Sequence, residues 1–303
     1  MPPADAHPAR QPAARGLDRD PSTAASTGTV LLTGAAGAVG TFLRRGLPAL
    51  GWHLRCLDLV RPARDDGLEW VTADITRPAE LAAAMAEASA VVHLAGIPGE
   101  TGFDRLLHTN IDGTYRVFEA AVRAGVRRFV YASSNHAVGR HRAGAPLDGA
   151  APVRPDSLYG VSKAFGEALG AYVADRFGMA VAGIRIGSCC ERPTRLRHLA
   201  TWLSPGDTVR LVHAMLTAPG LTYATVNGVS ANTRGWWELD SARAMGYQPQ
   251  DDAEEYAQEL LAGFGGPLAA DDPDAMYAGG RMAVPDPAVP GGEPSGGCAA
   301  PQA

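Results

Sequence analysis

The glycine-rich stretch Gly34–Gly40 constrains the fold of this chain more than any other feature of its sequence. It follows a short apolar run, Thr29–Thr33, that is typical of a buried strand, and it leads into a run with helical spacing that ends near Leu50. Glycines let the backbone turn tightly and let a phosphate approach it, and the next helix offers unpaired N–H groups. The loop could be an ordinary tight turn, but its place between strand and helix favours a dinucleotide site. The residues expected there are Gly34, Gly37, Ala38, Val39 and Gly40.

The alternation of apolar run and helical run continues along the chain. Further strands are predicted at His53–Leu57, Glu69–Ala73, Ala90–Leu94 and Arg128–Ala132, and a long helix runs from about Phe103 to Ala124. Strand-then-helix units in succession imply right-handed crossovers and a parallel sheet with helices on both faces. The predicted fold class is therefore α/β, a Rossmann-like doubly wound sheet, with ligands beyond the carboxyl ends of its strands.

The second predicted strand ends at a carboxylate, Asp58, 18 residues beyond Gly40. A carboxylate at this place accepts hydrogen bonds from an adenosine ribose and repels a 2′-phosphate, so the sequence predicts NAD as the cofactor. Leu59 is expected beside it. Arg61 and Arg64 follow closely and leave NADP open as an alternative.

The next two strand ends offer further cofactor contacts. Asp74 and Ile75 are placed to meet an adenine edge, although Asp74 is equally consistent with a solvated turn. The stretch Leu94-Ala95-Gly96 ends the fourth strand with small residues that leave room for a cofactor. His93, in the middle of that strand, is interpreted as a core histidine with satisfied hydrogen bonds.

Tyr159 and Lys163 form the strongest candidate catalytic pair. Residues four apart lie one turn from each other on the same helical face. A phenol, with a pKa near ~10, is a poor base unless a cation within ~4–6 Å stabilises its anion. Lysine can supply that charge, so the pair suits proton abstraction from an alcohol. Taken alone, the spacing also fits an ordinary amphipathic helix.

Composition excludes several classes of function. The chain has 303 residues, a net charge of −5 and no apolar run approaching the ~20 residues of a membrane span. We therefore expect no nucleic-acid partner, no membrane partner and a cytoplasmic location. The four cysteines, Cys56, Cys189, Cys190 and Cys298, lack the spacing of a metal site, and none is predicted. The adjacent pair is expected to line a pocket or the core.

Both ends of the chain lack apolar periodicity, so we expect disordered tails at residues 1–28 and 265–303. The folded unit then runs from about Thr29 to Phe264. It divides into a nucleotide-binding part, residues 29–186, and a small C-terminal substrate-binding part, residues 187–264. Within the C-terminal tail, Tyr277 and Met282 are possible anchors onto the core or onto a neighbouring subunit.

The combined motifs resemble the extended short-chain dehydrogenase/reductase family. They are Thr33-Gly34-x-x-Gly37-x-x-Gly40, Asp74-Ile75, His93-Leu94-Ala95-Gly96, Asn110-x-x-Gly113-Thr114, Tyr131-Ala132-Ser133-Ser134 and Tyr159-x-x-x-Lys163. The resemblance covers about residues 29–186 and implies a homo-oligomer that binds NAD. It also implies that Ser134 holds the reacting oxygen, that Tyr159 is the acid/base and that Lys163 lowers its pKa. Asn110 would support this proton network, and Ile186 would lie at the cofactor.

A narrower resemblance, to the uronate dehydrogenases within that family, extends to about Phe264. It rests on Ser134-Asn135-His136-x-x-Gly139, Tyr159-Gly160-Val161-Ser162-Lys163, Arg185-Ile186-Gly187-Ser188-Cys189, Thr201-Trp202-Leu203-Ser204, Ser230-Ala231-Asn232 and Gly235-Trp236-Trp237. It implies oxidation of a hexuronate at C1 to an aldarolactone, with NAD+ as hydride acceptor. The sugar pocket would be lined by Ser134, Asn135, His136, Ser188 and Arg197.

Two residues of this pocket differ from the simple family pattern or have a second interpretation. Arg197 lies in a basic loop with Arg192, Arg195 and His198, so it is also readable as a surface cation. Pro98 departs from the pattern, because the relatives tend to have a small hydroxyl residue there. Two other functions stay open. A nucleotide-sugar epimerase or reductase would need a cationic diphosphate pocket, and a non-enzymatic NAD sensor would not need Ser134, Tyr159 and Lys163 together.

Overall fold

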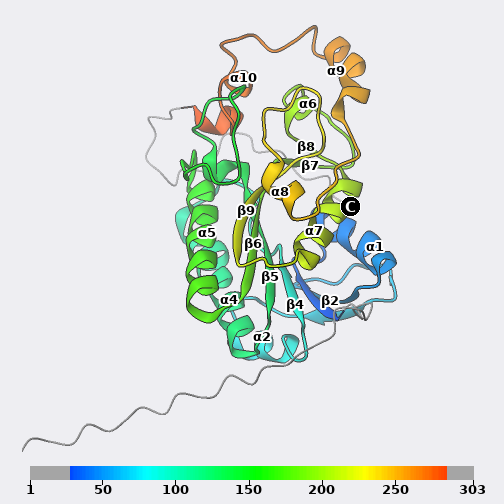
Figure 1. Ribbon diagram of the computed structural model, residues 1–303, viewed down its shortest axis with the longest axis vertical. Helices are drawn as coiled ribbons and strands as arrows, with labels where there is room; N and C mark the ends of the chain where they lie inside the picture. Colours follow the sequence, from blue (N-terminus) through cyan, green and yellow to red (C-terminus); the bar gives the residue numbers. More distant parts are fainter. Residues whose placement is uncertain (1–27, 285–303) are drawn as a thin grey trace, which may run out of the picture.

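The structure is a computed structural model that describes residues 28–284. Its centre is a seven-stranded, all-parallel sheet with the strand order β3-β2-β1-β4-β5-β6-β9 (Figure 1). The strands are β1 (Thr29–Thr33), β2 (His53–Asp58), β3 (Glu69–Thr72), β4 (Ala90–His93), β5 (Arg128–Ser134), β6 (Ala180–Ile186) and β9 (Tyr223–Gly228). The predicted fold class is confirmed.

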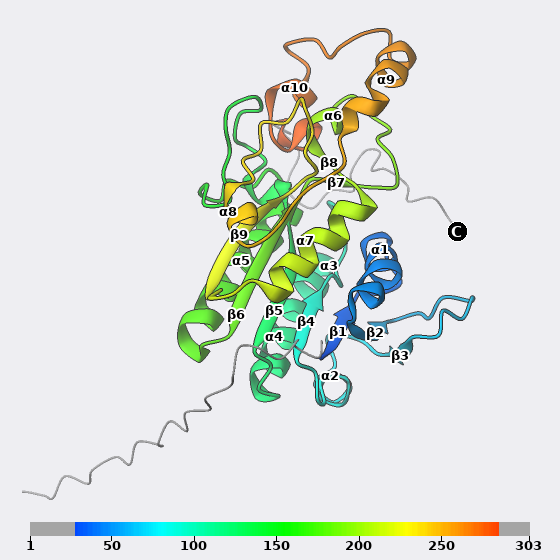
Figure 2. The same ribbon diagram turned by 45° about the vertical axis from the view of Figure 1, so that its right-hand side comes forward.

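Helices cover both faces of the sheet, as a doubly wound fold requires (Figures 1 and 2). One layer contains α1 (Ala38–Gly46), which the short helix η1 (Leu47–Leu50) follows, together with α7 (Pro205–Thr217) and α8 (Asp240–Ala244). The other contains α2 (Pro78–Ala84), α4 (Gly113–Arg123) and α5 (Leu158–Phe177). Because the central strands are buried on both faces, they are apolar without alternation, as in the fully buried run Val30-Leu31-Leu32.

The order of strands places a topological switch point between β1 and β4. The chain leaves β1 toward β2 and β3 on one side, and it continues from β4 toward β5 and β6 on the other. The connections that follow β1 and β4 therefore diverge at the carboxyl edge of the sheet and leave a crevice between them. The glycine loop follows β1 and Gly96 follows β4, so both lie at this crevice.

The predicted long helix from Phe103 to Ala124 is one helical run with an irregular middle. It consists of α3 (Phe103–Leu106), a π-helical segment η2 (Leu107–Asp112) and α4. Propensity and periodicity do not distinguish a π-helical turn from an α-helical one, so this turn was not predicted. Such turns are frequent at functional sites, and this one carries Asn110.

The predicted substrate-binding part, residues 187–264, shares its core with the nucleotide-binding part. Its strand β9 pairs with β6 and completes the sheet, and α7 packs against α1. Small elements extend beyond the carboxyl edge. They are η3 (Asn135–Val138), β7 (Ser188–Cys189), α6 (His198–Thr201), β8 (Trp202–Leu203), η4 (Ala253–Tyr256) and α9 (Ala257–Gly263).

The predicted start of the C-terminal tail at residue 265 is wrong. The chain continues into α10 (Pro273–Met276) and η5 (Gly280–Ala283), and Ala278 and Ala283 are fully buried. Small residues and backbone hydrogen bonds hold this segment, so it has no apolar periodicity to reveal it. Tyr277 is an anchor, since the guanidinium groups of Arg140 and Arg142 lie 5.5 and 5.2 Å from its ring centre. Residues 1–27 and 285–303 of the predicted tails lie outside the described residues.

Candidate active site

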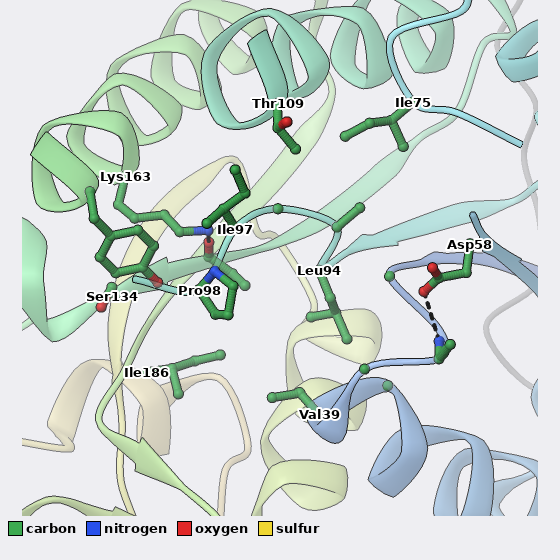
Figure 3. Close-up of a pocket in the computed structure, with 18 of the residues that line it drawn as sticks. Val39, Asp58, Ile75, Leu94, Ile97, Pro98, Thr109, Ser134, Lys163 and Ile186 are labelled. Carbon is green, nitrogen blue, oxygen red and sulfur yellow. Dashed lines mark hydrogen bonds between the residues drawn. The ribbon is translucent and has the colours of Figure 1, made fainter. Parts of the chain in front are cut away.

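A cavity of about 1030 Å³ lies at the carboxyl edge of the sheet, where the sequence places its ligands (Figure 3). Most of the predicted site residues line it. They are Gly34, Gly37, Val39, Gly40, Asp58, Leu59, Asp74, Ile75, Leu94, Ala95, Gly96, Ser134, Asn135, His136, Tyr159, Lys163, Ile186 and Arg197. Three predicted residues, Ala38, Asn110 and Ser188, are not among the lining residues.

The glycine loop and α1 form one end of the cavity. Gly37 precedes α1, and neither a capping side chain nor an acidic residue neutralises the first turn of that helix. Its N–H groups and positive end are therefore available to an anion. At Gly40 a Cβ atom would lie 2.5 Å from the carbonyl oxygen of Gly34, so only glycine allows the helix to start this close to the loop. This cradle fits a dinucleotide pyrophosphate.

Asp58 connects the glycine loop to the end of β2. Its Oδ2 accepts a hydrogen bond from the Ala36 N–H at 2.9 Å, which is the dashed line in Figure 3. Its Oδ1 accepts one from the Leu59 N–H at 2.8 Å. These bonds fix the carboxylate at the cavity wall, where an adenosine ribose of NAD would meet it. The residues present therefore fit NAD at this end.

Asp74 lies at the cavity and also stabilises a turn, so the two interpretations of this residue are compatible. Its Oδ1 accepts hydrogen bonds from the backbone N–H and the hydroxyl of Thr76, each at 2.8 Å. These bonds, that from the Thr76 N–H foremost, hold the pKa of Asp74 below its usual value. Ile75, its buried neighbour, lines the same part of the cavity.

Ser134, Tyr159 and Lys163 all line the other end of the cavity. Figure 3 shows Ser134 and Lys163 there. Ser134 ends β5, Tyr159 lies in the first turn of α5, and Lys163 lies one turn further on. The Lys163 ammonium donates to the Ala132 carbonyl at 2.9 Å and lies 5.5 Å from the centre of the Tyr159 ring. The three side chains therefore come together as the sequence predicts.

Burial dominates the acid–base properties of this pair. It raises the pKa of Tyr159 to about 12, an effect that a hydrogen bond with Ser134 opposes and the charge of Asp156 reinforces. Burial also lowers the pKa of Lys163 to about 8. A lowered tyrosine pKa was expected from the resemblance. The structure gives a raised one instead, because the cost of burying a phenolate outweighs the gain from the Ser134 hydrogen bond.

Two side chains cap the N-terminus of α5 and fix its position. The Ser157 hydroxyl accepts a hydrogen bond from the Gly160 N–H at 3.0 Å. The Glu100 carboxylate accepts from the N–H groups of Leu158 and Tyr159, at 3.2 and 2.8 Å. Glu100 follows β4, so it connects the helix that carries Tyr159 to the opposite wall of the cavity. Sequence reasoning missed Glu100, because its partners are distant in the chain.

Asn110 lies behind the cavity wall rather than in it. Its Oδ1 accepts from the Ile97 N–H at 2.7 Å, and its Nδ2 donates to the Ile97 carbonyl and to the Ser162 hydroxyl, each at 3.1 Å. These bonds hold the loop after β4 against α5. Pro98, the departure from the family pattern, lines the cavity in this loop, and its side chain offers no hydrogen bond.

His136 is oriented by a carboxylate that sequence reasoning missed. Its Nδ1 lies 2.8 Å from Oδ2 of Asp156, whose side chain is fully buried, and its ring packs edge-on against Tyr159 with 5.8 Å between ring centres. The available signal was the stretch Pro155-Asp156-Ser157 directly before the Tyr159 helix. Ser188, near this end, bonds its hydroxyl to that of Thr201 at 2.8 Å.

Arg197 is a buried cation of the cavity wall, so its interpretation as a surface residue is wrong. Its side chain is only 13% exposed, and its Nε lies 3.6 Å from Oδ1 of Asp274. Its Nη2 donates to the Ala278 carbonyl at 3.0 Å, which also accepts from Asn135 Nδ2 at 3.1 Å. Both partners of Arg197 belong to the segment predicted as a tail.

Other predictions concern cysteines, metals and membranes. Cys189 lines the cavity, and Cys190 lies beside it as a free thiol. Within residues 28–284, no three histidine, cysteine or acidic side chains gather as metal ligands would. Over the same residues, none of the helices has the length and apolar character that spanning a membrane requires.

Comparisons with known proteins agree with this geometry. The model of the NAD dependent epimerase/dehydratase family matches residues 30–203. A uronate dehydrogenase of Pseudomonas putida is 39% identical over 85% of this chain and 96% of its own length. An NAD-dependent glucose-6-phosphate dehydrogenase of Haloferax volcanii is 40% identical over 76% of this chain and 96% of its own.

Among solved structures, a mutant uronate dehydrogenase from Agrobacterium tumefaciens in complex with NAD superposes with a TM-score of 0.79. It is 38% identical, and the match covers 84% of this chain and 96% of that one. The resemblance found in the sequence is therefore confirmed.

Proposed function

Because the chain belongs to the NAD dependent epimerase/dehydratase family, we propose that it oxidises a hexuronate, galacturonate or glucuronate, at C1 to the aldarolactone with NAD+. The observation that carries this proposal is Arg197, a buried guanidinium in the wall of the cavity that Ser134 and Tyr159 also line. Arginine binds a carboxylate through two parallel, charge-assisted hydrogen bonds. A sugar acid whose carboxylate is held there would have its C1 end toward Tyr159.

The chain's own residues would orient the sugar and move one proton. When bound, NAD+ supplies the acceptor for the hydride that leaves C1. Ser134 would hold the C1 hydroxyl by a hydrogen bond, and the Tyr159 oxygen would remove its proton. Because burial gives Tyr159 a high pKa, its anion needs a neighbouring cation, and Lys163 is placed to provide one.

The remaining pocket residues would select the sugar. His136, oriented by Asp156, and Asn135 would meet its hydroxyl groups, and Ser188 is proposed to lie at the same end. Pro98 contributes only an apolar surface, so one polar contact of the relatives would be absent. The Haloferax volcanii relative is named for a different anionic sugar, a phosphate ester. Since arginine also binds phosphate, a sugar phosphate is the second candidate substrate.

NADH formation with a panel of sugars tests the proposal. Uronates should exceed the matching neutral aldoses by about 10- to 100-fold in kcat/KM, because a hydrogen bond to a charged group contributes ~1.5–3 kcal/mol. Arg197→Ala should lose most of this preference. Arg192→Ala is the matched control, since Arg192 is an exposed cation of the same loop, paired with Glu259. Equal rates for acidic and neutral sugars would refute the proposal. Faster turnover of glucose 6-phosphate would favour a sugar phosphate as the substrate, and faster turnover of UDP-sugars would favour a nucleotide-sugar enzyme.

The predicted homo-oligomer and cytoplasmic location belong to this proposal as well. Both follow from the resemblance and the composition, and size-exclusion chromatography with light scattering would test the first.

A further inference from the structure

Residues 272–283, here called the strap, pack behind two residues of the cavity wall, because the Ala278 carbonyl accepts hydrogen bonds from Arg197 and Asn135. Three backbone hydrogen bonds seat the strap on the loop after β5. They run from Gly279 N to Gly139 O at 3.0 Å, from Ala278 N to His141 O at 2.9 Å, and from Ala143 N to Met276 O at 3.0 Å. The strap is thus fixed in place independently of its contacts with Arg197.

Two glycines bring the backbone of the strap directly against the charged groups of the site. A Cβ atom on Gly279 would collide with the Asp156 carboxylate. A Cβ on Gly280 would collide with the Asp274 carboxylate and would lie 3.0 Å from Nε of Arg197. Gly280 also has φ +64°, which favours glycine. This close approach places Asp274 and the Ala278 carbonyl against the guanidinium.

The guanidinium of Arg197 is held at two places by the strap. The Ala278 carbonyl accepts from Nη2, and Asp274 lies opposite Nε, whose N–H is buried without a hydrogen-bond acceptor. Asp274 is itself anchored, because its Oδ1 accepts from the Arg281 N–H at 3.1 Å. Burial lowers the pKa of Arg197, and the charges of Asp274 and Asp156 counteract that effect. Asp274 therefore both orients the buried cation and compensates its charge.

Arg197 has a second space into which it could turn. A separate cavity of about 250 Å³ is lined by Arg197 and Asp274 together with Trp236 and Leu261, and it shares neither Ser134 nor Tyr159 with the first. Removal of the Asp274 carboxylate would enlarge this second cavity and release Nε. The Ala278 carbonyl would then be the one group of the strap that still holds the guanidinium toward the substrate cavity.

We propose that Asp274 is a positioning residue that holds Arg197 toward the substrate cavity and thereby sets the preference for acidic over neutral sugars. The inference rests on the proposed function, since it assumes that Arg197 receives the sugar carboxylate. Asp274 acts through Arg197 and does not itself contact the substrate. Its effect should accordingly appear in the KM for uronates rather than in the chemical step.

The first experiment measures Asp274→Ala with uronates and neutral aldoses. We expect the uronate kcat/KM to fall about tenfold or more, mostly through KM, because the cation is no longer held for its anion. Aldose turnover and the Kd for NAD should change far less. Asp274→Asn should recover only part of the loss, since it keeps the oxygen that accepts from the Arg281 N–H but not the charge opposite Nε. Asp271→Ala is the control, because Asp271 is an exposed carboxylate just before the strap.

A double-mutant cycle separates positioning from a general structural effect. If Asp274 acts through Arg197, Asp274→Ala should leave the uronate-to-aldose ratio of the Arg197→Ala variant unchanged. An unaltered ratio in Asp274→Ala itself, or equal losses with both kinds of sugar, would overturn the inference. If Arg197→Ala keeps the uronate preference, Arg197 does not receive the sugar carboxylate, and the proposed function itself is refuted. Thermal unfolding and NAD binding establish that each variant is folded.

Discussion

Tyr159 and Lys163 show how burial changes the chemistry of individual residues. The same desolvation raises the pKa of the phenol to about 12 and lowers that of the ammonium to about 8, because each group is driven toward its neutral form. At neutral pH the lysine still carries its charge. The lysine can therefore stabilise a phenolate only while the solution stays below about pH 8.

Tyr159→Phe tests the role of this phenol as the base. We expect turnover to fall at least ~10²-fold, since general base catalysis contributes ~10²–10⁴. The Kd for NAD should change little, because the ring still packs against His136. Tyr172→Phe, at an exposed tyrosine of the same helix, is the control. Turnover near that of the wild type would remove Tyr159 from the mechanism.

Asp58 should decide between the two nicotinamide cofactors. Its carboxylate is fixed by the N–H groups of Ala36 and Leu59, so it cannot easily turn away from a 2′-phosphate. We expect kcat/KM with NAD+ to exceed that with NADP+ by well over tenfold, since opposed like charges cost several kcal/mol. Asp58→Ala should reduce the ratio of kcat/KM with NAD+ to kcat/KM with NADP+. Equal use of both cofactors by the wild type would mean that Arg61 and Arg64 neutralise the repulsion.

His93 should make stability depend on pH. It is fully buried between the hydroxyls of Thr33 and Thr114, and burial, followed by the charge of Lys163, lowers its pKa from 6.5 to about 3. Between these values the unfolded chain binds a proton that the folded chain does not. Stability should therefore fall as the pH drops below 6.5, by up to about 1.4 kcal/mol per pH unit.

Urea denaturation at several pH values measures this dependence. His93→Gln should reduce the dependence of the unfolding free energy on pH between pH 6.5 and about pH 4. This holds however much the substitution itself lowers stability at pH 7. The matched variant His53→Gln, at an exposed histidine, should keep the slope of the wild type. A slope in His93→Gln equal to that of the wild type would show that other groups cause the acid sensitivity.

The sequence identified residues whose chemistry depends on local spacing. The Tyr159–Lys163 pair, the glycine loop and the carboxylate at a strand end are each defined within one short segment. Asp156, Glu100 and Asp274 were missed, since their roles arise only when separate segments meet. An acidic residue in a polar loop looks the same in the sequence whether it is solvated or holds a buried arginine.

Among the elements, the junction of β1, the glycine loop and α1 tolerates the least change. At Gly40 a Cβ would lie 2.5 and 2.6 Å from the carbonyl oxygens of Gly34 and Ala35, and backbone atoms cannot move aside as a flexible side chain can. The start of α1 is therefore fixed relative to β1 by contact between main chains.

Gly40→Ala should shift α1 away from the loop. We expect a lower Tm and a loss of NAD affinity of at least tenfold, because the helix N-terminus would no longer meet the pyrophosphate. Gly263→Ala, at a glycine with open space around it at the end of α9, is the control. Isothermal titration with NAD and thermal unfolding measure both effects. Unchanged NAD affinity in Gly40→Ala would show that the glycine loop does not bind the cofactor.

Five of the seven strands of the main sheet, β1 to β5, were predicted, because each is a short apolar run, whereas β6 and β9 were not. The predicted strand His53–Leu57 matches β2 to within one residue. The π-helical turn at Leu107–Asp112 was not predictable, since it differs from an α-helix in hydrogen bonding rather than in composition. That turn nevertheless carries Asn110, which holds the loop at Ile97.

For the whole molecule, the main difference from the sequence prediction is where the folded unit ends. Composition predicts a tail from residue 265, yet Ala278 and Ala283 are fully buried and the Ala278 carbonyl accepts hydrogen bonds from Arg197 and Asn135 of the cavity wall. Removal of residues 265–303 should lower the Tm by several degrees and abolish the uronate preference. Differential scanning fluorimetry and the sugar panel measure the two effects.

Removal of residues 1–27 is the comparison for this truncation. That segment has little apolar surface to bury, and ordering it would cost ~1–2 kcal/mol per residue. We expect its loss to leave the Tm nearly unchanged. If both truncations behave alike, the strap contributes nothing to stability.

The position of the strap in the chain also determines the order in which a newly made molecule acquires its properties. Synthesis proceeds from the N-terminus, at about 5–20 residues per second, and folding can follow it. The glycine loop, Asp58 and Tyr159 leave the ribosome well before Ala278 does. A growing chain can therefore assemble its nucleotide end before the strap is present to hold Arg197. The preference for acidic over neutral sugars, which depends on the strap, is therefore acquired after the nucleotide-binding end has formed.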